Sequence, residues 1–572
     1  MNTIFQLLRC LLVLASCYGF WRFTIRRFQL PPEISLFVSL SFIGLTSFLF
    51  GIVGLLFYGA LIILGLGLIL CCVSLIKRES LRPLLTPGVL AFCILAVFLV
   101  LRLYGDLFTH VDNYNHWASS VHGLLMYNKF ASDELRYTLA LNYPLGSSCL
   151  IYWFCRCCGV QSEWFQALTQ DIYLISSVCT LFVFLPRDSS KLRSLCFAGL
   201  VVIIMSMFCS VIDFNELLVD TLLPCAALGC LVLITIPDGS AKKTLPIIIV
   251  CAFIPMIKTS GLFYSVAFAF IYAIIDGGGV KKKLGRFLTP LVPALVIKQL
   301  WELHLHLAFT DPDSFKFSTS LATLSSNVSG LDGEASLYII FYFLRSTFLS
   351  LSFVALLTAF AVVAVLIYKA HKWGELWKLY TAVVCIWLGY TICLLGMYLV
   401  SMPIEESIRL ASFDRYYGSG LIFTAGALVM LCVRCPRAVD TKKFMLSLAA
   451  VILLCIVFLR PDPEYCLNRR FREPTHYYTV RKEFYDICAE NWIPSMDTLF
   501  ILCNESEHML PVISWYLFST ENTLVCSQDN LDTLGEEFNT FEFYIVFDET
   551  EEQVNFVTEK KGYYQRAGYT YN

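Results

Sequence analysis

The sequence predicts an all-α polytopic membrane protein that carries a small α/β domain at its C-terminal end. Of its 572 residues, 57% are hydrophobic and only 15% are charged, whereas a soluble domain carries about a quarter charged residues. The mean hydropathy is +0.68. Apolar runs long enough to cross a bilayer recur up to about residue 460, and backbone surrounded by lipid must satisfy its hydrogen bonds within helices.

About 13–14 membrane helices are expected from the length of these runs. The run at residues 33–76 is too long for one crossing, so it is divided near Gly51. The first run has neither a basic leader nor a small-residue cleavage pattern, which favours a membrane helix over a removed signal. The expected spans are residues 4–21, 33–50, 52–75, 85–105, 164–185, 194–212, 217–236, 243–258, 260–276, 285–305, 348–369, 377–400, 418–434 and 443–460.

Basic residues mark one side of this arrangement. Short cytoplasmic loops of membrane proteins are enriched in Lys and Arg, and with the spans above seven basic loops fall on the same side, which is therefore predicted to be cytoplasmic. These loops carry Arg22, Arg26 and Arg27; Lys77, Arg78 and Arg82; Arg187, Lys191 and Arg193; Lys242 and Lys243; Lys281, Lys282 and Lys283; Lys369, Lys372 and Lys378; and Arg434, Arg437, Lys442 and Lys443.

The opposite, outer side then receives the polar segments. These are residues 106–163, 213–220, the region of Lys258, and the loops 306–347 and 401–417. Residues 1–460 are predicted to form the transmembrane domain and residues 461–572 an extracytoplasmic α/β domain. In this tail a helix is expected at 479–490 and β-strands at 498–502 and 541–547.

Overall charge and cysteine content exclude some function classes and leave others open. The net charge of −2 argues against a nucleic-acid partner, because no large basic field is present to release phosphate counterions. Most of the 24 cysteines lie inside apolar runs, where cysteine behaves as a small hydrophobic residue. The cluster at Cys155, Cys157 and Cys158 has no second Cys/His pair at zinc spacing.

The densest polar and aromatic cluster follows the fourth predicted span. Ionisable groups at membrane depth are costly and usually mark a function or a water-filled cavity. The alternative is a solvated loop in which Asp112 and Asn113 cap the next helix, with Tyr114 and Trp117 in an interfacial aromatic belt. The cluster comprises Asp112, Asn113, Tyr114, Asn115, His116 and Trp117.

A second acidic cluster contains Asp213, Asn215, Glu216 and Asp220. Glu216 and Asp220 are four residues apart, so on a helix both carboxylates share one face, where like charges repel. That arrangement predicts a cation, a proton or a polar ligand between them. The alternative is a solvated helix start, where acidic residues complement the helix dipole.

Two cationic clusters lie on the same predicted side. Lys258 separates two apolar runs in the segment 255–261 and offers a point charge for a phosphate; the alternative is a lysine that extends along a helix end toward water. Arg415, in the segment 412–418, presents a planar fork that matches phosphate oxygens; the alternative is a local salt bridge with Asp414.

Together these clusters resemble the GT-C superfamily of membrane glycosyltransferases, which take sugars from polyprenyl-phosphate carriers. Asp112 matches the aspartate of the first large outer loop that acts as base in that superfamily. Tyr143 and Pro144 resemble its Tyr-Pro segment, and the stretch from Asn215 to Asp220 resembles its second acidic turn. The Lys258 hinge resembles a Thr-Lys-x-x-Gly-like element, and Arg415 with Tyr416 resembles the late Arg-Tyr element near the donor phosphate.

The resemblance implies an inverting single displacement. Asp112 is expected to take the proton of an acceptor hydroxyl, and Lys258 and Arg415 to stabilise charge on the departing phosphate. Donor or substrate contacts are expected from Asn113, Asn115, His116, Tyr143, Asn215, Glu216, Asp220 and Tyr416. Glu216 and Asp220 are also candidates for binding a divalent cation, where oxygen ligands favour Mg²⁺, Mn²⁺ or Ca²⁺ over zinc.

Two other function classes remain open at this point. One is a transporter or flippase of lipid-linked sugars, although no repeated halves are visible and the polar clusters lie at one face and not at the midplane. The other is a polysaccharide polymerase or ligase, although the 306–347 loop has few basic residues. The expected partners are a polyprenyl-phosphate-linked sugar, a glycan or protein acceptor and the lipid bilayer. A bacterial plasma membrane is favoured because no eukaryotic targeting signal stands out.

Overall fold

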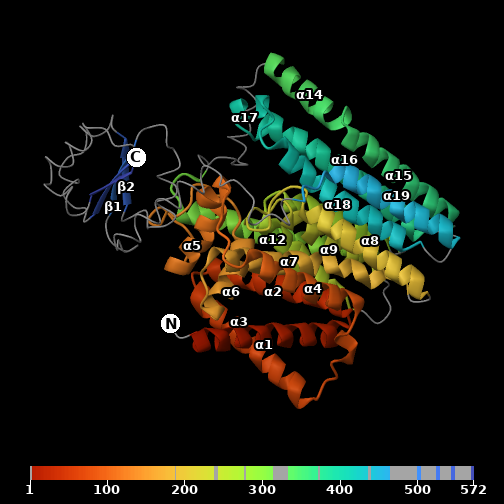
Figure 1. Ribbon diagram of the computed structural model, residues 1–572, viewed down its shortest axis with the longest axis horizontal. Coiled ribbons are helices and arrows are strands. Elements are labelled where there is room, and N and C mark those ends of the chain that lie inside the picture. Colours follow the sequence, from red (N-terminus) through yellow and green to blue (C-terminus); the bar gives the residue numbers. More distant parts are fainter. Residues whose placement is uncertain are drawn as a thin grey trace.

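The protein folds into a helical bundle, followed by a small sheet (Figure 1). The computed structural model describes residues 3–186, 189–236, 242–275, 278–312, 333–370, 374–435 and 440–463, together with the backbone of four short strands between residues 499 and 571. In this part of the chain, nine helices are long and apolar enough to cross a membrane, and four shorter apolar helices accompany them. The chain is therefore a helical multi-pass membrane protein.

Each of the fourteen predicted spans corresponds to a helix. The helices are α1 (Thr3–Phe28), α2 (Pro32–Ile52), α3 (Leu56–Ile76), α4 (Pro87–Leu103), α7 (Glu163–Val178) with the continuing η3 (Cys179–Phe184), α8 (Ser190–Phe208), α9 (Leu222–Thr235), α10 (Thr244–Ile257), α11 (Gly261–Ile275), α12 (Val280–Ala308), α15 (Leu351–Lys369), α16 (Glu375–Val400), α18 (Phe413–Val433) and α19 (Thr441–Leu459).

Local sequence explains where several of these helices begin and end. Pro32 and Pro87 occupy the first helical positions of α2 and α4, where a missing N–H costs nothing. The side chains of Thr86 and Asp440 accept hydrogen bonds from backbone N–H groups in the first turns of α4 and α19. The long run at 33–76 is divided after Ile52, close to the predicted break at Gly51.

The basic loops on the N-terminal side of the chain meet at one end of the bundle. Glu79, after α3, binds Arg22 at 2.9 Å and Arg26 at 2.8 Å, which joins the last turns of α1 to the loop that follows α3. The backbone N–H of Lys242 donates to the carbonyl of Phe28 at 2.8 Å, which adds the loop before α10. This agrees with the prediction that these loops share a side.

The contacts of Arg434 place further basic loops at the same end of the bundle. Arg434, after α18, binds Glu375 at the start of α16 at 2.5 Å and lies 4.8 Å from the ring centre of Phe184, at the end of η3. Because η3 packs against α2 and α4, both groups of loops belong to the same end. At the same end Thr244 lies 3.1 Å from Tyr272, near the end of α11.

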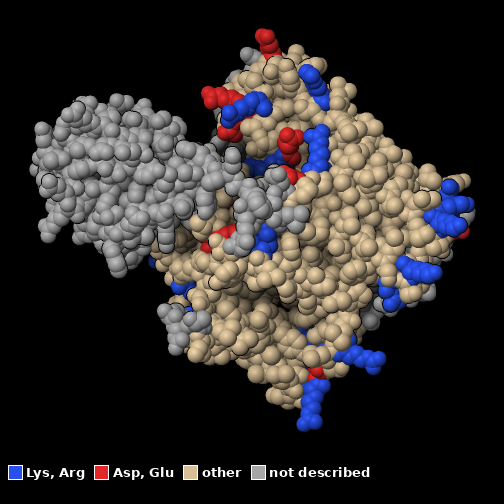
Figure 2. Space-filling model, viewed as in Figure 1, with Lys and Arg blue, Asp and Glu red and all other residues tan. Residues whose placement is uncertain are grey.

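Figure 2 shows Lys and Arg side chains gathered at this basic end, to the right and below, where α8, α16 and α19 begin. Acidic and basic side chains also lie together at the opposite end, in the region of α17 (Ile404–Ile408). The described surface between the two ends is mostly uncharged in this view, as expected for a face that contacts lipid.

The centre of the bundle is formed by α2, α7, α9 and α18. Every residue of α9 is buried, and α18 is buried over nearly its whole length. Figure 1 shows α7 and α9 in the middle of the bundle, whereas α1 and α3 lie at its edge. An internal site is therefore expected where these central helices begin or end.

Residues 106–163, the predicted outer segment, contain two helices that were not predicted. The segment contains α5 (Ala118–Tyr127) and α6 (Gly146–Cys158). All but one residue of α6 is buried, and α6 packs against α2 and α1. The indole N–H of Trp153 donates to the carbonyl of Ala60 in α3 at 3.2 Å. With 13 residues, α6 is shorter than a bilayer span, so hydropathy did not identify it.

Each of the two remaining predicted outer loops contains a helix. The 306–347 loop contains α14 (Gly333–Phe348), whereas its residues 313–332 lie outside the described part of the chain. The 401–417 loop contains α17 and the first turn of α18.

The C-terminal tail contains a four-stranded parallel sheet in the order β2-β1-β3-β4. Its strands are β1 (Leu499–Cys503), β2 (Thr523–Ser527), β3 (Phe543–Phe547) and β4 (Gly568–Tyr571). The strands predicted at 498–502 and 541–547 are thus confirmed to within two residues. Parallel pairing is typical of α/β domains. The helix predicted at 479–490 lies outside the described residues.

Candidate functional site

All four predicted polar clusters contribute a side chain to one cavity of about 450 Å³, here called the polar cavity. It lies at the end of the bundle opposite the basic loops, between the segment that follows α4, the end of α10, and the turn from α17 to α18. Of the predicted site residues it is lined by Asp112, Asn115, His116, Tyr143, Asp220, Lys258, Arg415 and Tyr416.

A chain of alternating charges crosses this cavity. An Nη1 atom of Arg415 lies 2.5 Å from Asp112 Oδ2, and its Nε lies 3.4 Å from Asp220 Oδ2. On the other side of Asp220, Lys258 Nζ donates to Oδ1 at 2.7 Å. The alternative of a local salt bridge between Arg415 and Asp414 is wrong, because the carboxylate partners of Arg415 are Asp112 and Asp220.

Asp220 keeps its charge although it is buried. Burial alone would raise the pKa of this carboxyl group, but the neighbouring Lys258 and Arg415 outweigh burial and hold its pKa below the usual range. The Tyr416 ring adds to the cationic corner, because Lys258 Nζ lies 4.7 Å and Arg415 Cζ 5.2 Å from the ring centre.

Local structure explains why Lys258 points into the cavity. α10 contains Pro255 and ends at Ile257, so Lys258 is extended before α11 begins at Gly261. A Cβ atom on Gly261 would collide with the carbonyl oxygen of Ile254, so the two helices approach too closely for any larger residue. The alternative of a lysine extended along a helix end toward water does not hold, because Lys258 is bound to a buried carboxylate.

Arg415 is presented by a turn with unusual backbone geometry. Leu410 and Ser412 both adopt left-handed conformations, with φ of 48° and 57°. This conformation is uncommon for residues other than glycine. The hydroxyl of Tyr398 donates to the carbonyl of Ala411 at 2.8 Å, and Ser419 Oγ donates to the carbonyl of Asp220 at 2.5 Å. These bonds fix the start of α18 against the acidic turn.

Asp112 precedes a short π-helical turn, η2 (Asn113–Trp117), which runs into α5. π-Helical turns are rare and occur frequently at functional sites. The Asp112 side chain makes no capping hydrogen bond, so the helix-cap alternative is wrong. Tyr114 and Trp117 are buried, which contradicts the alternative of an interfacial aromatic belt.

His110 is a neutral neighbour of Asp112. The backbone N–H of Asp112 donates to His110 Nδ1 at 3.0 Å, so this nitrogen carries the lone pair and Nε2 carries the proton. Burial lowers the pKa of His110, which keeps the ring uncharged. The 4.0 Å separation between Nδ1 and Asp112 Oδ2 is therefore not an ion pair.

The aromatic wall of the polar cavity consists of His116, Trp117 and Tyr143. The His116 ring lies 4.5 Å from each of the other two rings, which are themselves 5.7 Å apart. Asn115 also lines the cavity, while its carbonyl accepts hydrogen bonds from Thr138 Oγ1 and the N–H of Leu139.

Asn113, Asn215 and Glu216 lie behind the cavity and do not line it. Glu216 is buried and accepts hydrogen bonds from the N–H of Thr109 at 3.0 Å, from Thr109 Oγ1 and from Asn113 Nδ2. Asn215 Nδ2 donates to the carbonyl of Leu107 at 3.1 Å. All of these contacts are made to the protein itself.

The prediction that Glu216 and Asp220 share one helix face is wrong. Residues 213–221 form a loop and α9 begins only at Leu222, so the two carboxylates have separate surroundings. Glu216 binds protein donors, and Asp220 binds the cations Lys258 and Arg415. In the described part of the chain no group of three or more His, Cys, Asp or Glu side chains could hold a metal ion. The divalent cation stays a prediction.

Two charged residues of the polar cavity were missed from the sequence. Glu406 and Arg409 belong to α17 and the turn after it. Residues 401–417 were assigned to the polar outer side from the sequence, but only the part from 412 onward was considered as a site.

A second cavity of about 330 Å³, here called the apolar cavity, adjoins the first and shares Tyr143, Lys258, Met402 and Tyr416 with it. Its remaining lining is mostly apolar and comes largely from α11 and α16, including Phe263, Tyr390, Cys393, Leu394 and Met397. A polar cavity and an apolar cavity therefore meet at Lys258.

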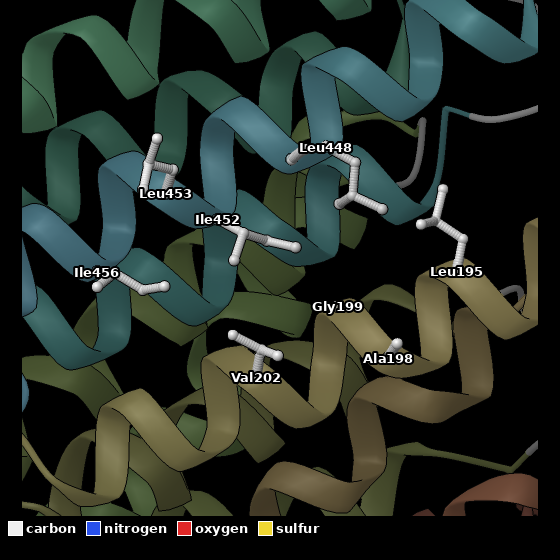
Figure 3. A pocket seen from close by; sticks show the side chains of 9 residues that line it. Leu195, Ala198, Gly199, Val202, Leu448, Ile452, Leu453 and Ile456 are labelled. Carbon is white, nitrogen blue, oxygen red and sulfur yellow. The ribbon is translucent and has the colours of Figure 1, made fainter. Parts of the chain in front are cut away.

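A third hollow, of about 310 Å³, lies between α8 and α19, far from these charges in the chain. Figure 3 shows that aliphatic side chains from both helices line it. It contains no polar side chain, so it offers no group for chemistry.

Comparisons with known proteins do not assign a family. No family model matches the chain, and neither a curated protein nor a solved structure does. The function is therefore inferred from the geometry of the site itself.

Proposed function

We propose that this protein is a membrane glycosyltransferase that moves a sugar from a polyprenyl-phosphate carrier to a hydroxyl acceptor. The observation that carries the proposal is the junction of the polar and apolar cavities at Lys258. A polyprenyl-phosphate sugar has matching parts in the same order: a polar sugar for the polar cavity, an anionic phosphate for Lys258, and an apolar chain for the apolar cavity.

The charges of the polar cavity suit a phosphate with a single negative charge. Lys258 and Arg415 flank Asp220. Lys258 lines both cavities, and Arg415 lines the polar cavity. Arg415 also lies on Asp112, so a phosphate that binds Arg415 competes with Asp112 for the same guanidinium. Donor binding would thereby release Asp112 at the moment when a base is needed.

The proposed reaction is a single displacement. The hydroxyl oxygen of the acceptor attacks the anomeric carbon while Asp112 takes the hydroxyl proton. The bond between this carbon and the phosphate oxygen breaks, and its electron pair leaves with the polyprenyl phosphate. Because the leaving group is a phosphate, no protein acid is required, and the configuration at the anomeric carbon inverts. Lys258 and Arg415 stabilise the charge that builds on the phosphate.

The finer features of the proposal come from the resemblance to the GT-C superfamily. They are a GT-C-like transmembrane domain over residues 1–460, an extracytoplasmic α/β domain over residues 461–572, and a site that faces outward from a bacterial plasma membrane. A glycan or protein serves as acceptor. A divalent cation, if it takes part, binds close to Asp220.

The test is transfer by the purified, reconstituted protein. A panel of polyprenyl-phosphate sugars is supplied with and without sugar or peptide acceptors, and the release of polyprenyl phosphate is measured. We expect release with at least one donor, and inversion in the product. Transport of an intact lipid-linked sugar across the vesicle membrane without any release would instead support the flippase alternative and contradict the proposal.

A further inference from the structure

The segment that carries Asp112 is held in place by side chains from other parts of the chain. Between the end of α4 and η2, residues 105–110 form no helix or strand. Instead, the N–H of Phe108 donates to Glu163 Oε2 at 2.7 Å, and the N–H of Thr109 donates to Glu216 Oε1 at 3.0 Å. The hydroxyl of Thr109 and the N–H of His110 also donate to Glu216.

Asn113 completes this arrangement from the other side of Asp112. Its Nδ2 donates to Glu216 Oε2, and its Oδ1 accepts the N–H of Leu217 at 3.0 Å. Both side chains are almost fully buried, Asn113 at 0% and Glu216 at 4% exposure. The Glu216 carboxylate and the Asn113 amide thus bind each other. Glu216 also binds the backbone shortly before Asn113, and Asn113 binds the backbone directly after Glu216.

We propose that Glu216 and Asn113 form a clamp that positions Asp112, and that Glu216 acts through Asp112 and does not contact the substrate. This inference rests on the proposed function, in which Asp112 is the base. Glu216 does not line the polar cavity, whereas Asp112 does. Because Asn113 follows Asp112 directly and Thr109 and His110 precede it closely, the clamp fixes the backbone on both sides of the base.

The clamp has a defined hydrogen-bond polarity. Since Asn113 Oδ1 is needed as acceptor for the N–H of Leu217, its Nδ2 must face Glu216. Position 216 must therefore present an acceptor. A buried donor that faces another donor loses its hydrogen bond and incurs the full desolvation penalty. This polarity allows the amide and the carboxylate to be exchanged as a test.

The experiment compares Glu216→Gln, Asn113→Asp and the double variant in the full-length, reconstituted protein. In Glu216→Gln the new amide nitrogen must face either Asn113 Nδ2 or the N–H of Thr109, so that one donor faces another, and in Asn113→Asp two carboxylates face each other. We expect each single change to lower kcat roughly 10- to 100-fold while KM for the donor changes little. The double change restores an amide facing a carboxylate, so kcat should return to within about three-fold of the wild-type value.

Hydrogen exchange provides a readout that does not depend on transfer. Backbone N–H groups of Thr109 and His110 should exchange faster in both single variants and return to wild-type rates in the double variant. Glu375→Gln is the matched control, because it makes the same chemical change in the exposed ion pair at the basic end. It should alter neither kcat nor exchange at residues 108–113.

The outcomes separate the two proposals. If the wild-type protein transfers no sugar, the proposed function fails, and the exchange rates still decide whether the clamp exists. If transfer occurs but the double variant is no better than the worse single variant in both kcat and exchange, the clamp is overturned. A single variant that raises KM for the donor strongly and leaves kcat unchanged would make Glu216 a substrate-binding residue and would also overturn it.

Discussion

Arg415 lies between two carboxylates, and its guanidinium group faces both at once. Nη1 contacts Asp112 at 2.5 Å while Nε faces Asp220 at 3.4 Å. A guanidinium group presents several donors in a fixed plane, whereas an ammonium group is a single point charge. The contact with Asp112 and Asp220 together therefore depends on arginine specifically and not only on a positive charge.

Replacing Arg415 by lysine tests this geometry. Arg415→Lys keeps the charge but cannot contact Asp112 and Asp220 together, so we expect KM for the donor to rise about 10-fold or more. The measurement is initial-rate kinetics over a range of donor concentrations. Arg434→Lys is the control, because Arg434 caps the other end of the same helix and pairs with an exposed glutamate. Equal kinetics in the two variants would contradict the account.

His116 predicts a pH dependence of stability. Burial lowers the pKa of His116 to about 3, whereas the unfolded chain has a value of about 6.5. Because the folded value is the lower one, the contribution of neutral His116 is complete above pH 6.5 and is lost as the pH falls from 6.5 toward 3. In this window the free energy of unfolding should fall by about 1.4 kcal/mol per pH unit from this group.

Thermal unfolding in detergent at pH 7 and pH 5 measures this effect. The wild-type protein should lose more of its apparent Tm on acidification than His116→Gln, which has no imidazole to protonate. The comparison is between the two pH slopes, so any constant loss of stability in the variant cancels. Parallel slopes for the two proteins would show that His116 does not resist protonation in the folded state.

The membrane helices could be predicted from the sequence, but which helices pack against one another could not. The fourteen spans were predicted because each is a long apolar run, and length and hydropathy are local properties. The turn between α17 and α18 was recognised only in part, because nothing local distinguishes Glu406 and Arg409 from a solvated loop. α6 was missed because, with 13 residues, it is shorter than a bilayer span.

The site was predictable as a set of residues but not as a set of contacts. Asp112, Asp220, Lys258 and Arg415 were selected because charges on one predicted face are costly without a role. Their pairing could not be derived, since Asp112 and Arg415 are 303 positions apart and Asp220 and Lys258 are 38 apart. Glu216 was assigned to the substrate because a helical period was assumed where the chain forms a loop.

The close approach at the α10–α11 junction gives a prediction for this element. In Gly261→Ala the new methyl group would meet the Ile254 carbonyl, so the helices must separate, at a cost of about 1–3 kcal/mol. We expect a lower Tm and weaker donor binding, because Lys258 lies in this turn. Gly65→Ala in α3 is the control, since a Cβ there meets nothing within 4 Å. A destabilisation no larger than that of the control would contradict the account.

In the part of the bundle that the structure describes, the two main groups of charged residues lie at opposite ends. The basic loops meet at one end, and the polar cavity lies at the other. The positive-inside tendency then predicts that the basic end faces the cytoplasm. The polar cavity and the sheet-bearing tail would then both face outward, which is the arrangement that the proposed reaction needs.

Reporter fusions test this orientation. A reporter that is active only outside the cytoplasm should be active when fused after residue 572, and inactive when fused in the basic loop between α18 and α19. The second fusion serves as the internal control for expression. The reverse pattern would invert the topology and remove the basis for an outward-facing site.

The most direct measurement of the central claim is sugar transfer by Asp112→Asn. Asparagine retains the shape of the side chain and can still accept a hydrogen bond from Arg415, but it cannot take the acceptor proton. A general base typically contributes about 10²–10⁴-fold, so kcat should fall by that order while donor binding and Tm are maintained. Transfer by Asp112→Asn at close to the wild-type rate would contradict the claim that Asp112 is the base.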